Sequence, residues 1–192
     1  MENESKTYDQ LVDEVHQLRQ RLAELEVLAA GRGVQAEQVA PPRPAFMLDR
    51  MDLEEIGERE IARVRRYGHP LSVIAFGIDS FDAITARHGS DSAEIVLNRI
   101  AAVVSEQIRM SDSLFRMDAE SEFLLLLPET DAAEARLIAE RLQDIIQEVK
   151  IPLQGGQISV TACAGAATCA IVEEGFSALR AQAEDSLRAA RP

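Results

Sequence analysis

Two groups of polar side chains between residues 109 and 130 have the types and the spacing to do chemistry. Three carboxylates, Asp118, Glu120 and Glu122, stand close together around the start of the apolar run FLLLLP. Clustered carboxylates can hold a divalent cation, or they can belong to a solvated turn. A little earlier, Arg109 and Asp112 place a fork of hydrogen-bond donors three residues from an acceptor. This pair could bind a ligand that offers both acceptors and donors, or it could stabilise its own turn.

The overall charge limits the classes of ligand that the chain can bind. Twenty basic and 33 acidic residues give the 192-residue chain a formal net charge of −13. Nucleic acids are bound by cationic surfaces, so no nucleic acid is expected as a ligand, and any anionic ligand would need a local basic pocket. No apolar run approaches the roughly 20 residues of a membrane span, and the charged amino terminus does not resemble a signal peptide. We therefore expect a cytoplasmic protein with no membrane contact, in which Cys163 and Cys169 are reduced thiols.

Residues 7–30 carry a seven-residue repeat of apolar side chains, which is typical of a coiled coil. The a and d positions of the repeat are Tyr8, Leu11, Val15, Leu18, Leu22, Leu25 and Ala29. The charged residues that flank these positions allow attractive pairs in a parallel or an antiparallel arrangement. We expect residues 1–30 to form a coiled-coil helix that pairs with a second copy or with a partner protein. The alternative is a helix that packs on its own domain.

A segment rich in glycine and proline separates this repeat from the rest of the chain. Residues 31–45, GRGVQAEQVAPPRPA, contain two glycines and three prolines and are expected to be a linker. From residue 46 onward the apolar pattern becomes that of a globular domain, and its core must be aliphatic because only 4% of the chain is aromatic. Residues 46–192 are therefore predicted to form the folded domain.

Apolar periodicity in this domain predicts alternating helices and strands. The expected order is a helix over 50–66, a strand over 71–78, a helix over 91–108, a hairpin of strands 113–117 and 121–128, a helix capped by Thr130, a strand over 157–167 and a helix over 176–190. In the helix after Thr130, we expect Ile138, Leu142, Ile145 and Val149 to face the core. This order predicts an α+β fold, a ferredoxin-like or palm-type antiparallel sheet covered by helices on one face.

Five stretches of this domain resemble the GGDEF domain, the diguanylate cyclase family. They are RRYGHPLSVIAFGIDSFDAITARHG, VLNRIAAVV, IRMSDSLFRMDAESEFLLLLPET, AERLQ and LRAQAEDSLRAA, which follow one another in the expected order. The resemblance implies two GTP molecules, one per subunit, that are condensed to cyclic di-GMP by a Mg²⁺-assisted attack of a 3′-hydroxyl on an α-phosphate. Carboxylates would hold the metal ions, and glycines in the hairpin would let backbone N–H groups approach the phosphates.

Several positions that this resemblance makes functional carry other residues. Gly77 stands where the family has its first metal-binding aspartate, so that only Asp79 remains of the acidic pair. Thr85 replaces the asparagine that reads guanine, and Glu94 replaces the second guanine-reading acid. We therefore expect the catalytic residues and the metal site to be lost.

The signature in the hairpin also departs from the family. Aligned on Phe123, the five signature positions are Ala119, Glu120, Ser121, Glu122 and Phe123. Aligned instead on Arg116, the two glycine positions are Asp118 and Ala119, and Glu120 is the acid. Either register places a side chain and added negative charge where a triphosphate would lie, and like charges about 4 Å apart repel by about 4 kcal/mol at an effective dielectric of 20. This predicts an inactive cyclase that needs no cofactor.

Arg109 and Asp112 match the Arg-x-x-Asp motif that members of the family often carry before the signature as a product-binding inhibitory site. The guanidinium can donate to guanine O6 and N7 or to phosphate, and the carboxylate can accept from guanine N1–H and N2–H. The resemblance therefore implies an RxxD-type site for cyclic di-GMP. The residues alone fit equally a guanidinium at a helix C-terminus and a carboxylate that caps a turn.

Three functions follow from these observations. The favoured one is a catalytically inactive GGDEF-family signalling protein of bacteria that acts as a cyclic di-GMP receptor or regulatory module. The second is a dimerisation or docking module that works through residues 7–30 without nucleotide. The third is a weak diguanylate cyclase that uses Mg²⁺ with Glu120, Glu122 and Asp79 in an altered geometry.

Overall fold

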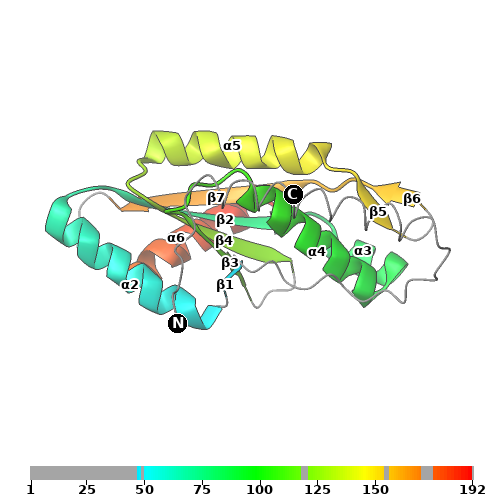
Figure 1. Ribbon diagram of the computed structural model, residues 1–192, viewed down its shortest axis with the longest axis horizontal. Helices are drawn as coiled ribbons and strands as arrows, with labels where there is room; N and C mark the ends of the chain where they lie inside the picture. The colour runs from blue at the N-terminus through cyan, green and yellow to red at the C-terminus, as the bar shows by residue number, and fades with distance from the viewer. Residues whose placement is uncertain (1–46, 49, 118–120, 154–155, 170–174, 192) are drawn as a thin grey trace, which may run out of the picture. The chain divides into compact units, whose positions relative to one another are not determined.

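The apolar runs of the sequence become the strands of a central sheet. A computed structural model of the chain describes residues 47–48, 50–117, 121–153, 156–169 and 175–191. The coiled coil predicted over 1–30 and the linker predicted over 31–45 lie outside the described residues. The elements (Figure 1) are β1 (Met47–Leu48), α2 (Arg50–Tyr67), β2 (Leu71–Ile78), α3 (Phe81–His88), α4 (Ser90–Ser105), β3 (Ser113–Arg116), β4 (Glu122–Pro128), α5 (Ala132–Glu148), β5 (Ile151–Leu153), β6 (Gly156–Ile158), β7 (Ala162–Cys169) and α6 (Phe176–Ala190).

Five strands form one sheet in the order β1-β3-β4-β2-β7. The central strand β2 pairs antiparallel with β4, from Leu71 opposite Pro128 to Gly77 opposite Glu122. It pairs antiparallel with β7 on its other side, and β3 pairs antiparallel with β4. The α+β prediction with an antiparallel sheet is confirmed. The two-residue strand β1, which runs parallel to β3, was not predicted.

Both faces of the sheet are covered by helices, so the expectation of a single covered face was wrong. In β4, Phe123, Leu125 and Leu127 belong to one core cluster, whereas Leu124 and Leu126 belong to another. Successive side chains of a strand point to opposite faces, so an uninterrupted apolar run needs a core on each side. The run FLLLLP therefore already carried the signal for a sheet buried on both faces.

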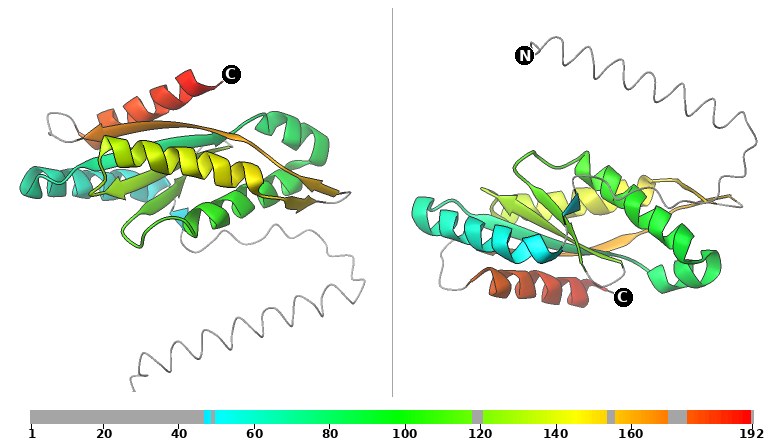
Figure 2. Two further views of the ribbon diagram at one scale, coloured as in Figure 1. Left: turned by 90° about the horizontal axis from the view of Figure 1, so that it is seen from above. Right: turned by 60° about the horizontal axis from the view of Figure 1, so that its bottom comes forward.

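The helices divide between these two cores. Helices α3, α4 and α5 contribute to the first core with residues such as Ile100 and Leu142. Helices α2 and α6 contribute to the second core with residues such as Ile61 and Phe176. Figure 2 shows α5 and α6 on opposite sides of the sheet. Among the described helices, none is both long enough and apolar enough to cross a membrane.

Helix α5 begins one residue later than predicted. Its N-cap is Asp131, whose Oδ1 accepts hydrogen bonds from the N–H groups of Ala133 and Glu134, both at 2.9 Å. The hydroxyl of Thr130 instead donates to the backbone oxygen of Pro128 at 3.1 Å. Both residue types cap helices well, so the sequence alone did not separate them. Farther along α5, Leu142 and Ile146 are fully buried, whereas Ile145, which was expected to face the core, is only half-buried.

The single strand predicted over 157–167 is in fact split between two sheets. Strand β6 pairs with β5 in a separate two-stranded sheet, and β7 pairs with β2 in the main sheet. Between them, the backbone oxygen of Thr161 accepts a hydrogen bond from the N–H of Asp79 at 2.9 Å. Helix α3, which leads from β2 to α4, was also absent from the predicted order. The choice of pairing partner depends on residues far away in the chain, which periodicity does not reveal.

Candidate functional site

The turn between α4 and β3 holds Arg109 and Asp112 through contacts of its own. The N–H of Arg109 donates to Oδ2 of Asp112 at 2.8 Å, and the N–H of Asp112 donates to the backbone oxygen of Arg109 at 3.0 Å. The hydroxyl of Ser111 donates to Oδ1 of Asp112 at 3.2 Å. The carboxylate is therefore fixed in place, and it keeps free lone pairs because its two oxygens together offer about four acceptor sites.

The side chain of Arg109 is exposed, and within the described part of the chain its guanidinium makes no hydrogen bond or ion pair. A second guanidinium comes from α5, where Nη2 of Arg141 donates to the backbone oxygen of Gln107 at 2.7 Å. Met110, between the two motif residues, is fully exposed. Sequence reasoning missed Arg141, because nothing in the local pattern says that α5 passes the end of α4. Two arginines and one fixed carboxylate thus lie near the same turn.

The resemblance assigns guanine recognition to the positions of Thr85 and Glu94. Both side chains make hydrogen bonds within the protein. The side chain of Arg116 on β3 forms a two-pronged ion pair with Glu94 on α4, at 2.5 Å and 2.8 Å. Both side chains are largely buried, with exposures of 15% and 30%, so the pair is only weakly screened by water. The hydroxyl of Thr85 donates to the backbone oxygen of Phe81 in its own helix at 3.2 Å.

Gly77, at the position of the family's metal-binding aspartate, lies under the guanidinium of Arg191. In the register of the sheet, Gly77 is flanked by Glu122 on β4 and Cys163 on β7. A Cβ on Gly77 would lie 2.5 Å from Nη2 of Arg191 and 3.6 Å from Cγ of Glu122. The same Nη2 lies 2.7 Å from Oε1 of Glu122. An ion pair thus fills the space that a side chain at position 77 would need.

Asp79 is also engaged by neighbouring groups. Its Oδ2 accepts a hydrogen bond from the hydroxyl of Thr161 at 2.6 Å. Burial raises the pKa of the Cys163 thiol above its ordinary value of 9.0, and a hydrogen bond to Asp79 and the charge of that carboxylate raise it further, while Arg191 acts in the opposite direction. At neutral pH the thiol is therefore protonated and donates to Asp79.

Only part of the predicted signature lies within the described residues. Asp118, Ala119 and Glu120 lie outside the described residues. The backbone oxygen of Ser121 accepts from the N–H of Ile78 at 3.1 Å, which ties the start of β4 to the end of β2. The ring of Phe123 stacks on Phe76 of β2, with ring centroids 5.1 Å apart, and anchors the strand in the core.

The Mg²⁺ that the resemblance implies does not fit those residues around Gly77 that the structure describes. Magnesium requires several oxygen ligands at about 2.0–2.1 Å in an octahedral arrangement. Gly77 supplies no side-chain oxygen, Asp79 is held by Thr161 and Cys163, and Glu122 is paired with a cationic side chain that would repel a metal ion. Throughout the described segments, no group of three or more His, Cys, Asp or Glu side chains could hold a metal ion.

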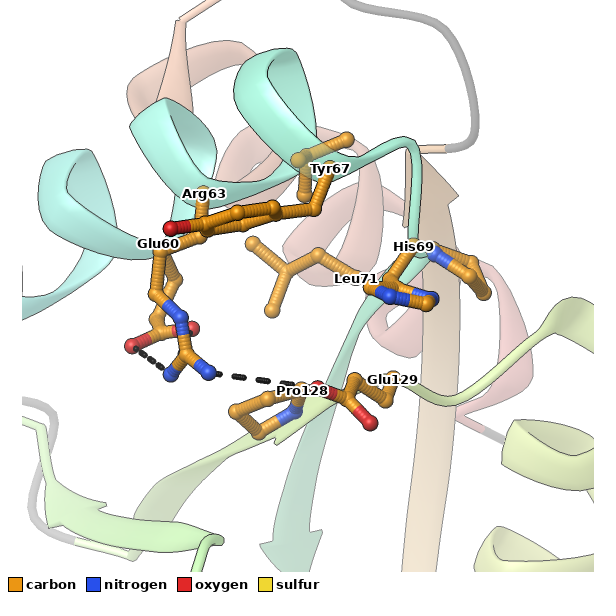
Figure 3. Close-up of a pocket in the computed structure, with 9 residues that line it drawn as sticks. Glu60, Arg63, Tyr67, His69, Leu71, Pro128 and Glu129 are labelled. Atoms are coloured by element: carbon orange, nitrogen blue, oxygen red, sulfur yellow. Dashed lines mark hydrogen bonds and ion pairs between the residues drawn. The ribbon is translucent and has the colours of Figure 1, made fainter.

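A small hollow between the end of α2 and the end of β4 (Figure 3) does not add a binding site. Its volume is about 20 Å³, which suffices for roughly one water molecule. On its rim Arg63 pairs with Glu60 at 3.1 Å and with Glu129 at 3.9 Å, both at the surface. The arginines near the end of α2 therefore present an ordinary charged helix face.

Comparison with known proteins places this arrangement in a family. The model of the diguanylate cyclase GGDEF domain matches residues 47–192. Diguanylate cyclase DosC of Escherichia coli K12 is 31% identical over 122 residues, which are 63% of this chain and 26% of DosC. The match thus spans about a quarter of the length of that relative.

Two solved structures agree in fold. Diguanylate cyclase SiaD of Pseudomonas aeruginosa, solved in complex with its activator SiaC, superposes with a TM-score of 0.72 and 25% identity over 95% of this chain and 67% of SiaD. The coiled coil and GGDEF domain of DgcB from Caulobacter crescentus, solved in complex with c-di-GMP, gives a TM-score of 0.70 at 16% identity over 93% of this chain and 88% of that one, a likeness of fold alone. With its matched domain and its central antiparallel sheet, the chain belongs to the GGDEF family of diguanylate cyclase domains.

Proposed function

We propose that this protein is a catalytically inactive GGDEF module that binds cyclic di-GMP through Arg109 and Asp112. The observation that carries the proposal is the turn itself, in which Arg109 has an exposed side chain and its backbone N–H holds the carboxylate of Asp112 at 2.8 Å. Guanine presents two acceptors, O6 and N7, to a guanidinium and two donors, N1–H and N2–H, to a carboxylate. A preorganised carboxylate loses little conformational freedom when such a base binds.

The second arginine at the turn supports an anionic ligand. Arg141 is anchored to the backbone of Gln107, close to Arg109. A cyclic dinucleotide carries two phosphates, and a guanidinium pairs with phosphate through two parallel hydrogen bonds. Because the whole chain has a net charge of −13, attraction of such a ligand must come from a local group of this kind.

The inactive part of the proposal rests on the former catalytic positions. Gly77 has no carboxylate, Glu122 is paired with Arg191, and Glu94 is paired with Arg116. Each of these contacts would have to break before GTP and Mg²⁺ could be bound in the manner of a cyclase. We therefore expect no formation of cyclic di-GMP from GTP with either Mg²⁺ or Mn²⁺.

The test is isothermal titration of the full chain with cyclic di-GMP. We expect a dissociation constant of about 10 μM or tighter for the wild type, and a loss of at least about tenfold for Arg109→Ala, which removes a charge-assisted pair of hydrogen bonds. The matched control is Arg136→Ala, since Arg136 is an arginine of α5 that is 81% exposed and pairs only with Glu140 among the described residues. This control should bind like the wild type.

Two results would contradict the proposal. The absence of binding heat at high ligand concentration would remove the receptor function and leave the docking module that works through residues 7–30. Turnover of GTP by the purified wild type would remove the inactive assignment and favour the weak cyclase. The first result concerns the turn at 109–112 alone, and the second concerns the former catalytic positions alone.

A further inference from the structure

We infer that the guanidinium of Arg191 is a built-in replacement for the divalent cation that the lost metal site would have held. The inference concerns the surface around Gly77 and goes beyond the proposed receptor function. It would stand even if the turn at 109–112 bound nothing. It assigns a role to Arg191, a residue that the sequence did not single out.

The geometry places one cationic group against Gly77 and Glu122 together. Nη2 of Arg191 lies 2.7 Å from Oε1 of Glu122 and 2.5 Å from where a Cβ of residue 77 would be. Gly77, Glu122 and Cys163 occupy facing positions on three neighbouring strands, so their side-chain positions share one face of the sheet. Arg191 follows the last residue of α6, the helix that packs on this face.

The electrostatics of this surface are consistent with a cation supplied by the chain. Two carboxylates lie at the ends of adjacent strands: Asp79 directly follows β2, and Glu122 begins β4. The pKa of the neighbouring Cys163 thiol is raised by Asp79 and lowered by Arg191. Without a counter-ion, Glu122, which is only 23% exposed, would carry a poorly solvated negative charge. A guanidinium attached to the chain neutralises this charge whether or not metal ions are present.

The replacement explains why glycine is compatible with position 77. An aspartate at this position would add an oxygen ligand, but its Cβ would occupy the space of the guanidinium. A metal ion beside Glu122 would also lie next to a positive charge, which opposes its binding. The residues at 77 and 191 are therefore coupled through charge: the guanidinium can swing aside to admit a side chain at 77, but while it stays beside Glu122 its positive charge opposes a metal ion there.

The experiment measures the melting temperature, Tm, of full-length variants by circular dichroism, in EDTA and then in millimolar MnCl₂ or MgCl₂. The variants are G77D combined with R191A, and G77D combined with R188A. Arg188 is the matched control, since it lies on the same helix and pairs with Asp185 in an ion pair that is about two-thirds exposed. We expect the wild type to show the same Tm in all buffers.

We expect G77D/R191A to gain a cation-dependent rise in Tm of roughly 5 °C when the cation is at about a hundred times its dissociation constant. The control G77D/R188A keeps Arg191 and should gain no more than about a fifth of that rise. An equal rise in both double variants would overturn the inference, as would a folded G77D/R191A without any rise, or a wild type that melts at a lower temperature in EDTA.

A second measurement does not depend on the folding of these double variants. Arg191→Met keeps the length of the side chain and removes its charge. In EDTA it should lower Tm by several degrees more than Arg188→Met does, because only the former leaves Glu122 without its partner. Equal losses for the two substitutions would overturn the inference.

Discussion

At the residue scale, two arginine side chains hold carboxylates of the domain in ion pairs. Arg116 holds Glu94 through two hydrogen bonds, and Arg191 holds Glu122 at 2.7 Å. Each of these two carboxylates is therefore available to a ligand only if its arginine partner is displaced. The contrast is Arg109, which is exposed and whose guanidinium makes no hydrogen bond or ion pair in the described segments.

Cys163 gives a prediction on the same surface that can be followed by pH. Burial raises the pKa of its thiol, and Asp79 raises it further. Alkylation by iodoacetamide, which requires the thiolate, should therefore have a midpoint above pH 9.0. Asp79→Asn should lower that midpoint and speed alkylation at pH 8 several-fold. Mass spectrometry in a Cys169→Ala background isolates the signal, and a midpoint at or below 9.0 in the wild type would contradict the prediction.

The same shift has a consequence for stability. In the folded state the thiol keeps its proton at pH values where the unfolded chain has begun to lose it. The free energy of unfolding that this thiol contributes is therefore fully present below its ordinary pKa. It is lost as the pH rises from that value through the raised pKa of the folded state.

At the scale of elements, the close approach of α6 to β7 determines where the carboxyl-terminal arginine can reach. A Cβ on Gly165 would collide with the backbone of α6 at Ser186, Leu187 and Ala183. The absence of a side chain lets the helix lie directly on the strand. This packing brings the end of α6, and with it Arg191, to the strand ends at Gly77 and Glu122.

Gly165→Ala should therefore destabilise the domain by about 1–3 kcal/mol, because backbone of the helix cannot move aside as a flexible side chain could. Urea unfolding measures the loss. The matched control is Ala166→Gly, which removes one half-buried methyl group from the neighbouring position and should cost no more than about 1 kcal/mol. A Gly165→Ala protein as stable as the wild type would show that the contact between α6 and β7 is loose.

At the scale of the whole molecule, we propose separate roles for the domain and for the amino-terminal repeat. The domain over 47–192 carries the sheet, the turn at 109–112 and the Arg191 ion pair. The repeat over 7–30 has leucine at each d position, and we propose that it joins two chains. A receptor built in this way would present its ligand sites in pairs.

Charged substitutions in the repeat test this arrangement. Leu18→Glu with Leu25→Glu places charge at two d positions and should weaken self-association at least about a hundredfold in analytical ultracentrifugation. Gln17→Glu with Gln20→Glu adds the same charge at outward-facing positions and should leave the dimer intact. Removal of residues 1–40 should likewise give a monomer. A wild type that is monomeric at all concentrations would contradict the prediction.

The sequence by itself determined the type and position of most elements and the family. Strand 71–78 and helix 176–190 were predicted with their observed bounds, because backbone geometry imposes its period on neighbouring residues. The same local information pointed to the turn that holds Arg109 and Asp112. The interpretation of Gly77 as a replaced aspartate stays a prediction.

Only the tertiary structure decided what surrounds these residues. Arg191 lies over Gly77, Arg141 reaches the backbone near Arg109, and β7 rather than β6 joins the main sheet. Each of these contacts joins segments far apart in the chain, and its formation depends on how whole helices pack against the sheet. Periodicity carries no record of that packing, so the ion pair of Arg191 with Glu122 beside Gly77 appears only in the tertiary structure.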